Sequence, residues 1–227
     1  MVVDVKKLIG QAVVGLLLVS VLLFLAAGTL AWWAGWIFLA LFTICTGGYT
    51  AWMYVKKPEL LRERMELSQP DQKTWDKVFL GIIFLYALTW LILMPLDAVR
   101  FHWSHMPIWL EVTGGVLFVC SFIIYFLVAR ENPYMASVAR VQEERGQTVI
   151  STGPYRYVRH PMYSGSLLLF LGIPLLLGSW YGVGLALGAG LLLAWRAVME
   201  ERMLRQELQG YVSYMAQVKY RLIPLVW

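Results

Sequence analysis

The sequence carries little charge for its length. Only 15% of its 227 residues are Asp, Glu, Lys or Arg, whereas a soluble domain usually has about a quarter. Hydrophobic residues make up 59% of the chain, and the mean hydropathy is +0.64. A soluble core has no room for such an excess of apolar residues, so the composition indicates an integral membrane protein.

Cysteine and histidine are also scarce. The two cysteines, Cys45 and Cys120, both lie inside apolar runs, so the sequence encodes neither a disulfide framework nor a metal knuckle. His102 and His105 are three residues apart, but no third ligand lies near them in the sequence. Because a zinc site needs at least three protein ligands, we expect no metal cofactor.

The net charge of +5 does not indicate a nucleic-acid partner. The basic residues lie in short stretches between apolar segments instead of along one amphipathic face. A membrane surface rich in anionic lipid accounts for this distribution better than DNA or RNA does. We therefore expect membrane lipids, and no nucleic acid, among the partners of the chain, while its oligomeric state is not predicted.

Six apolar stretches are long enough, or nearly so, to cross a bilayer. The first follows Lys6 and Lys7, and at about 20 residues it is expected to be a retained signal anchor instead of a cleaved signal peptide. The fifth contains Pro174 and is expected to form a tight hairpin with the sixth through Ser179 and Trp180. The sequence thus predicts an all-α protein with about six transmembrane helices, at roughly 8–27, 30–55, 78–96, 108–129, 162–178 and 181–199.

The basic residues also predict the orientation. Eighteen of the nineteen Lys and Arg residues fall in the N-terminal segment, in the loops 56–77 and 130–161, and from residue 196 onward; Arg100 is the exception. Positively charged connections stay on the cytoplasmic side. We therefore expect a multi-pass protein of a cell inner membrane or the endoplasmic reticulum, with both termini and the active site on the cytoplasmic side.

The first polar segment that could form part of an active site is residues 147–165, which read QTVISTGPYRYVRHPMYSG. Pro161 lies where the fifth helix begins, a position that proline favours. The free N–H groups of that helix would then face an anionic group held by Arg159 and His160. The alternative is that these residues only contact lipid phosphates.

The second segment, residues 195–224, continues the sixth helix. Arg196 and Glu200 are four residues apart and so share one helix face, whereas Glu201 points about 100° away. Ionisable groups this close to a membrane are costly unless they are paired or face an aqueous cavity, which favours a functional site over a surface ion pair. Tyr211 and Tyr214 recur at helical spacing and predict a short C-terminal interfacial helix.

Together, TGPYRYVRHPMYSG, WRxxxEERML and GYVSYMAQVKYRLIP resemble the isoprenylcysteine carboxyl methyltransferase family and its phospholipid methyltransferase relatives. The resemblance covers residues 147–224. It implies an S-adenosylmethionine-dependent enzyme with Arg196 as the catalytic residue that faces the methyl acceptor, and with Arg159 and Glu201 binding substrate. The residues that the resemblance assigns to cofactor binding are Gln147, Thr148, Val149, Ile150, Tyr155, His160, Pro161, Met162, Tyr163 and Glu200.

The resemblance also implies a division of the chain. Residues 1–130 would form four helices that shape the lipid-facing side, and residues 131–227 would form the catalytic region. The substrate would be a lipid or prenylated molecule from the bilayer, methylated on a carboxylate. A phospholipid amine is an alternative acceptor.

Two other functions compete with methyl transfer. Membrane sterol reductases that use NADPH share a related RHPxY segment. Against them, the Glu200–Glu201 pair, the terminal GYxxY and RLIP pattern and the Gly165–Ser166 pair favour a methyltransferase. A transporter or scaffold gains little support, because no apolar stretch has an ionisable residue near its middle.

Overall fold

The computed structural model describes residues 4–65 and 72–227. Five of its helices are long and apolar enough to cross a membrane, one of them α4 together with the π-helical turn η1 (Leu96–Arg100), while α6 is shorter at 17 residues. The described residues form no strand, which confirms the all-α membrane fold. The six predicted helices are α1 (Val5–Ala27), α2 (Trp33–Lys56), α4 (Thr74–Pro95), α5 (Ile108–Glu131), α6 (Pro161–Leu177) and α7 (Trp180–Glu207).

Four shorter elements lie outside these helices. The C-terminal helix α8 (Tyr211–Gln217) forms as predicted, whereas α3 (Pro58–Met65) was not predicted. α3 follows α2 after a single break at Lys57 and has Pro58 in its first turn, where proline needs no hydrogen-bond partner. The two 3₁₀ turns are η2 (Glu143–Arg145) and η3 (Gly153–Arg156).

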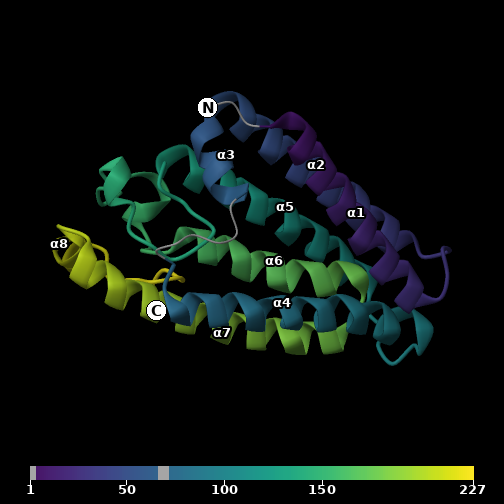
Figure 1. Cartoon of the computed structure of the whole chain (residues 1–227). Helices are drawn as coiled ribbons and strands as arrows, with labels where there is room; N and C mark the ends of the chain where they lie inside the picture. The colour runs from purple at the N-terminus through teal and green to yellow at the C-terminus, as the bar shows by residue number, and fades with distance from the viewer. Residues whose placement is uncertain (1–3, 66–71) are drawn as a thin grey trace.

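The short helix α6 lies in the middle of the bundle, in contact with α2, α4, α5 and α7 (Figure 1). Its approach to α5 depends on two glycines. A Cβ atom at Gly114 would lie 2.3 Å from the backbone nitrogen of Leu176, and one at Gly172 would lie 2.8 Å from the carbonyl oxygen of Gly114. Small residues let helix backbones pack closely where lipid offers no hydrophobic driving force. α6 is therefore held by direct backbone contact with α5.

The predicted hairpin between α6 and α7 is confirmed. Gly178 adopts a left-handed conformation with φ 79°, which a residue with a side chain rarely tolerates. The Ser179 hydroxyl then caps α7 by accepting a hydrogen bond from the Gly182 amide at 2.9 Å. The same hydroxyl donates to the fully buried carboxylate of Asp97, which anchors the hairpin to η1, the turn that follows α4.

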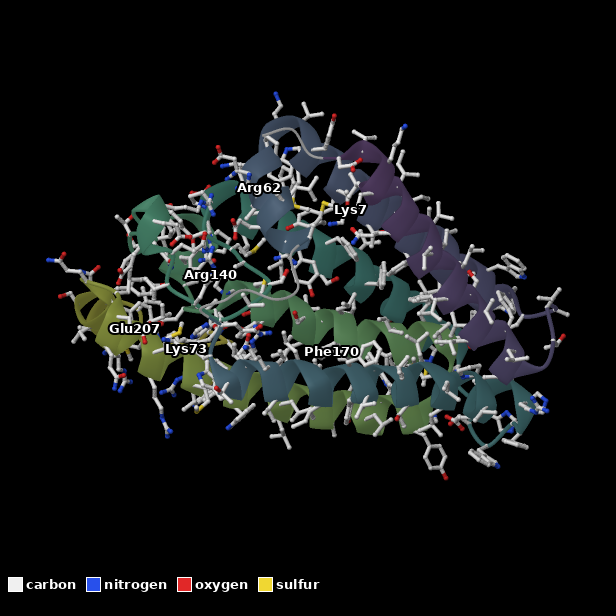
Figure 2. The ribbon with its side chains drawn as sticks, in the orientation of Figure 1. Lys7, Arg62, Lys73, Arg140, Phe170 and Glu207 are labelled. Carbon is white, nitrogen blue, oxygen red and sulfur yellow. The ribbon has the colours of Figure 1, made fainter. Side chains whose placement is uncertain are left out.

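The outer surface of the bundle is apolar along its length and charged at one end. Large hydrophobic side chains such as Leu25, Leu187 and Leu191 are each about 70% exposed, as expected for residues that face lipid. Figure 2 shows labelled charged residues of α3, α7 and the connecting segments gathered at the end that carries α3 and α8. The segment 132–160 lies at this same end (Figure 1). Described residues from three of the connections predicted to be cytoplasmic thus lie at the same end of the bundle.

Candidate active site

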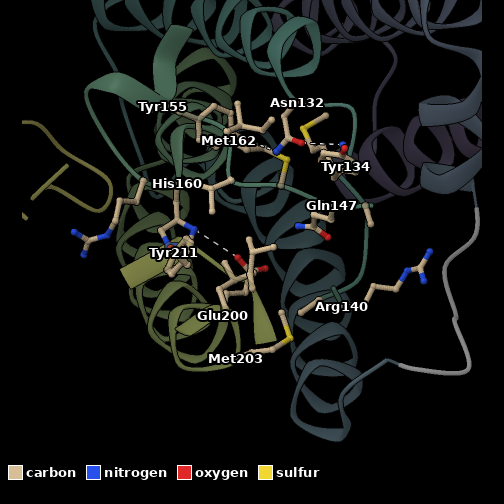
Figure 3. A pocket seen from close by; sticks show the side chains of 18 of the residues that line it. Asn132, Tyr134, Arg140, Gln147, Tyr155, His160, Met162, Glu200, Met203 and Tyr211 are labelled. Atoms are coloured by element: carbon tan, nitrogen blue, oxygen red, sulfur yellow. Dashed lines mark hydrogen bonds and ion pairs between the residues drawn. The ribbon is translucent and has the colours of Figure 1, made fainter. Parts of the chain in front are cut away.

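A polar cavity lies at the charged end of the bundle, between the segment 132–160, the first turn of α6, the C-terminal half of α7 and α8 (Figure 3). The structure brings both predicted segments to this cavity, although a helical hairpin separates them in the sequence. All ten residues assigned to cofactor binding line it, and so do Arg159 and Arg196. Glu201 is the exception among the predicted site residues and is not part of the lining.

Glu200 is the carboxylate that faces the cavity. Its Oε1 accepts a hydrogen bond of 2.5 Å from the hydroxyl of Tyr163, and its Oε2 lies 3.5 Å from Nδ1 of His160. The Nε atom of Arg196, one helical turn earlier, lies 3.5 Å from Oε1, as the spacing predicted. The side chain of Glu200 is 17% exposed. Glu200 is therefore oriented by its neighbours and remains accessible.

Glu201 points about 100° away from Glu200 around α7 and has a different environment. Its side chain is only 2% exposed, and it accepts hydrogen bonds from Nε of Arg159 at 2.6 Å and from Nε of Arg221 at 3.0 Å. Arg159 also donates through Nη1 to the carbonyl groups of Val218 and Lys219. The two side chains therefore bind each other and hold the C-terminal segment against the start of α6. The substrate-binding role of Arg159 and Glu201 stays a prediction.

His160 lies between the two adjacent carboxylates. Its Nδ1 is 3.5 Å from Glu200 and its Nε2 is 3.4 Å from Glu201, while its ring is parallel to that of Tyr163 with centroids 5.5 Å apart. Burial opposes a charge on the imidazole, but the hydrogen bonds and charges of the two glutamates outweigh it. The net effect raises the pKa of His160 above its ordinary value.

Arg196 is nearly buried at the edge of the cavity. Its Nη2 lies 2.9 Å from Oδ1 of Asp76 in α4 and donates to the carbonyl of Ser137 at 3.1 Å. Its guanidinium also covers the ring of Phe79, 4.8 Å from the centroid. Arg196 therefore forms ion pairs with two carboxylates, Asp76 through Nη2 and Glu200 through Nε.

The segment 148–150 forms a wall with unused backbone groups. Thr148, Val149 and Ile150 line the cavity in a non-helical conformation, and none of them takes part in a hydrogen bond that the described residues make. Thr148 is exposed and Val149 and Ile150 are half-buried, so the backbone groups of this strip are accessible to solvent or to a ligand. Such a strip is suited to bind the polar edge of a planar ring.

Tyrosines form much of the remaining wall. The hydroxyl of Tyr155 accepts a hydrogen bond from Asn132 at 2.7 Å, and burial raises the pKa of Tyr155 to about 12. Tyr211 and Tyr214 of α8 are buried, and Tyr214 donates to the carbonyl of Tyr155 at 2.8 Å. The sequence predicted α8 as an interfacial helix; in the structure its tyrosines close one side of the cavity.

Several lining residues were missed by sequence reasoning. Asp76 contacts the site from a helix far away in the sequence, and no local pattern links it to Arg196. Met135 and Met203 lie outside the set of residues that the resemblance assigned to the site, whereas Met162 belongs to it. The missed lining residues include Asn132, Tyr134, Met135, Ala139, Met203 and Leu208.

One family model matches the chain. It describes phospholipid methyltransferases and covers residues 109–209, from the first turn of α5 to just beyond α7. No curated protein matches the chain. The matched region contains His160, Arg196 and Glu200 and most of the cavity, whereas Asp76 lies outside it. Residues 109–209 of this chain are therefore similar to the phospholipid methyltransferase family, which includes the integral membrane methyltransferases of the isoprenylcysteine carboxyl methyltransferase type.

Proposed function

We propose that this protein uses S-adenosylmethionine to methylate a group carried on a lipid-like molecule. The observation that carries the proposal is the assembly of the two motif segments around one cavity at the charged end of an apolar bundle. The phospholipid methyltransferase match supports the reaction class. The apolar bundle supports a substrate that arrives through the bilayer.

The residues around the cavity suit this cofactor. Glu200 offers a carboxylate to the ammonium group or the ribose hydroxyls of S-adenosylmethionine. The unused backbone groups of 148–150 suit the edge of an adenine ring, and the tyrosine and methionine side chains suit its faces. These contacts fit an aromatic, positively charged ligand better than a metal ion or a free phosphate.

When bound, the cofactor supplies an electrophilic methyl group on a sulfonium. Because transfer of that group is an in-line displacement, positioning and exclusion of water contribute most of the rate. Tyr163 and His160 orient the carboxylate of Glu200 through their contacts with it. The segment 132–160 and α8 cover the cavity and keep water away from the reacting atoms.

A carboxylate, as on a prenylated cysteine, is the first candidate for the acceptor. Arg196 lies at the cavity edge, and a guanidinium binds a carboxylate through two parallel hydrogen bonds. An acceptor that is already an anion needs no general base. In this case Arg196 exchanges part of its contact with Glu200 for the acceptor.

A phospholipid amine is the second candidate, and the pairing of Arg196 favours it. Arg196 already contacts Asp76 and Glu200, so its charge is compensated before any substrate binds. An ammonium headgroup would instead approach Glu200 and lose a proton before attack. His160 and Glu200 are the groups within reach to accept that proton.

We propose that the charged end of the bundle faces the cytoplasm, with both chain termini on that side. The cofactor then enters the cavity from the aqueous phase and the acceptor from the membrane. The first four helices would shape the lipid entrance, as the sequence predicted.

Transfer of a labelled methyl group tests the function. Purified protein in detergent is incubated with S-adenosylmethionine labelled in the methyl group and with either an S-farnesylcysteine peptide or phosphatidylethanolamine. A methyl ester releases volatile methanol in base, whereas an N-methyl group does not, so one treatment distinguishes the products. Arg196→Ala is the negative control. Cofactor binding without transfer to either acceptor would refute the acceptor classes, and absence of binding would refute the function.

A further inference from the structure

Asp76 is a fully buried carboxylate in the first turn of α4, outside both the predicted motifs and the family match. Its Oδ2 accepts two hydrogen bonds of 2.9 Å, from the side-chain amide of Gln72 and from the backbone amide of Ala139. Its Oδ1 lies 2.9 Å from Arg196, as an ion pair without the alignment of a hydrogen bond. A buried carboxylate is retained at a cost unless it is paired in this way.

These contacts connect three separate parts of the protein. α4 supplies Asp76, the segment 132–160 supplies Ala139 and Ser137, and α7 supplies Arg196. Ala139 and Arg196 both line the cavity. The carboxylate of Asp76 therefore links Ala139, in one wall of the cavity, to the guanidinium of Arg196 at its edge.

Arg196 would have a different orientation without this contact. Glu200 alone would draw the guanidinium along α7 toward its own carboxylate, because the two residues share a helix face and lie one turn apart. Asp76 attracts it from α4, and the Phe79 ring of the same helix lies against it, 4.8 Å from its central carbon. The guanidinium is thus held between two carboxylates from two helices.

We propose that Asp76 is a positioning residue that sets the orientation of Arg196 toward the methyl acceptor. The inference rests on the carboxylate acceptor of the proposed function, which Arg196 would bind, and it extends the site to α4. Asp76 acts only through Arg196 and the adjoining loop and does not touch the cofactor. Its loss should therefore lower turnover and leave cofactor binding nearly unchanged.

The test compares Asp76→Asn with Asp97→Asn. Asp97 is an equally buried carboxylate near the opposite end of the same helical segment, where it binds Ser104 and Ser179 away from the cavity. We expect Asp76→Asn to lower kcat at least about tenfold per folded molecule, since small displacements of a positioning group have large effects. The dissociation constant of S-adenosylmethionine should change by less than about threefold, because no cofactor contact is removed. Asp97→Asn should reduce thermal stability with kcat per folded molecule retained.

A double variant tests whether Asp76 affects turnover through Arg196. If Asp76 acts through Arg196, the Asp76→Asn substitution has no further effect on kcat in an Arg196→Gln background. A full additional loss in that background, or normal turnover in Asp76→Asn itself, overturns the inference. Should Asp76→Asn fail to fold, Gln72→Met removes only one donor to Asp76; it should lower kcat with cofactor binding kept, and an unchanged kcat counts against the inference.

Labelling of arginine separates this inference from the proposed function. Phenylglyoxal modification, located by mass spectrometry, measures the accessibility of Arg196 without any turnover. Asp76→Asn should increase modification of Arg196 over the wild type, and Asp97→Asn should not. Equal labelling in all three proteins would overturn the inference even if methyl transfer is confirmed. Increased labelling would support it even if no acceptor is methylated.

Discussion

Replacing Glu200 with glutamine tests the cofactor site most sharply among single substitutions. Gln has nearly the same shape, so it keeps the packing of α7 and can still accept the hydrogen bond from Tyr163. It removes the negative charge that faces His160 and Arg196. The change is therefore electrostatic and leaves the cavity intact in shape.

The expected magnitude follows from the contact that is lost. A hydrogen bond to a charged partner contributes about 1.5–3 kcal/mol, which corresponds to about a 10- to 150-fold increase in the dissociation constant of S-adenosylmethionine. Isothermal titration calorimetry in detergent measures this constant directly. Glu207→Gln is the matched control, because Glu207 lies on the same helix and pairs with Lys73 at the surface, 2.8 Å away. Surface pairs of this kind contribute about 0–1 kcal/mol.

Wild-type affinity in a folded Glu200→Gln protein would refute the assignment of Glu200 to the cofactor. Equal weakening by Glu200→Gln and Glu207→Gln would indicate a general loss of charge instead of a lost contact. Weakened binding in the first variant alone is the predicted result.

Two further predictions concern stability. Gly114→Ala should lower the melting temperature by several degrees, because overpacking costs about 1–3 kcal/mol and the new Cβ atom would lie 2.3 Å from the backbone of Leu176. In the control Gly115→Ala the nearest atom lies 3.8 Å from the new Cβ atom, so this variant should melt like the wild type. Equal melting temperatures of the two variants would contradict the close packing of α5 against α6. The raised pKa of His160 means that protonation favours the folded state, so its contribution is fully present below the ordinary pKa of 6.5 and is lost as pH rises through the folded value. Thermal unfolding from about pH 6 to about pH 9 should show stability falling more steeply in the wild type than in His160→Gln, where Glu200 and Glu201 no longer have a titrating partner; parallel profiles would contradict the assigned protonation.

The helices were predictable because their signal is local. The length and hydrophobicity of each apolar stretch are enough to predict a membrane-spanning helix. The predicted ranges overlap every long helix of the structure. The ends were less well placed: α7 continues to Glu207, past the predicted end at 199, because its last two turns are polar yet still helical. The short helix α3 carries no membrane signal and was missed.

The site was predictable where residues are close in sequence. The four-residue spacing of Arg196 and Glu200 predicted their contact, and helix geometry predicted that Glu201 points about 100° away from Glu200. What Glu201 binds could not be predicted, because Arg159 and Arg221 reach it through the tertiary fold. The ion pair with Asp76 likewise joins distant parts of the chain. It also links the two regions proposed from the sequence, 1–130 and 131–227, whose boundary stays a prediction.

Thermal unfolding of the purified protein in detergent, with S-adenosylmethionine, its demethylated product or NADPH added, tests the central claim most directly. At a hundred times its dissociation constant, a ligand of the folded state stabilises it by about 2.7 kcal/mol. The methyl donor and its product should each raise the melting temperature, and NADPH should leave it unchanged. Stabilisation by NADPH with no response to the methyl donor would contradict the account and favour a reductase.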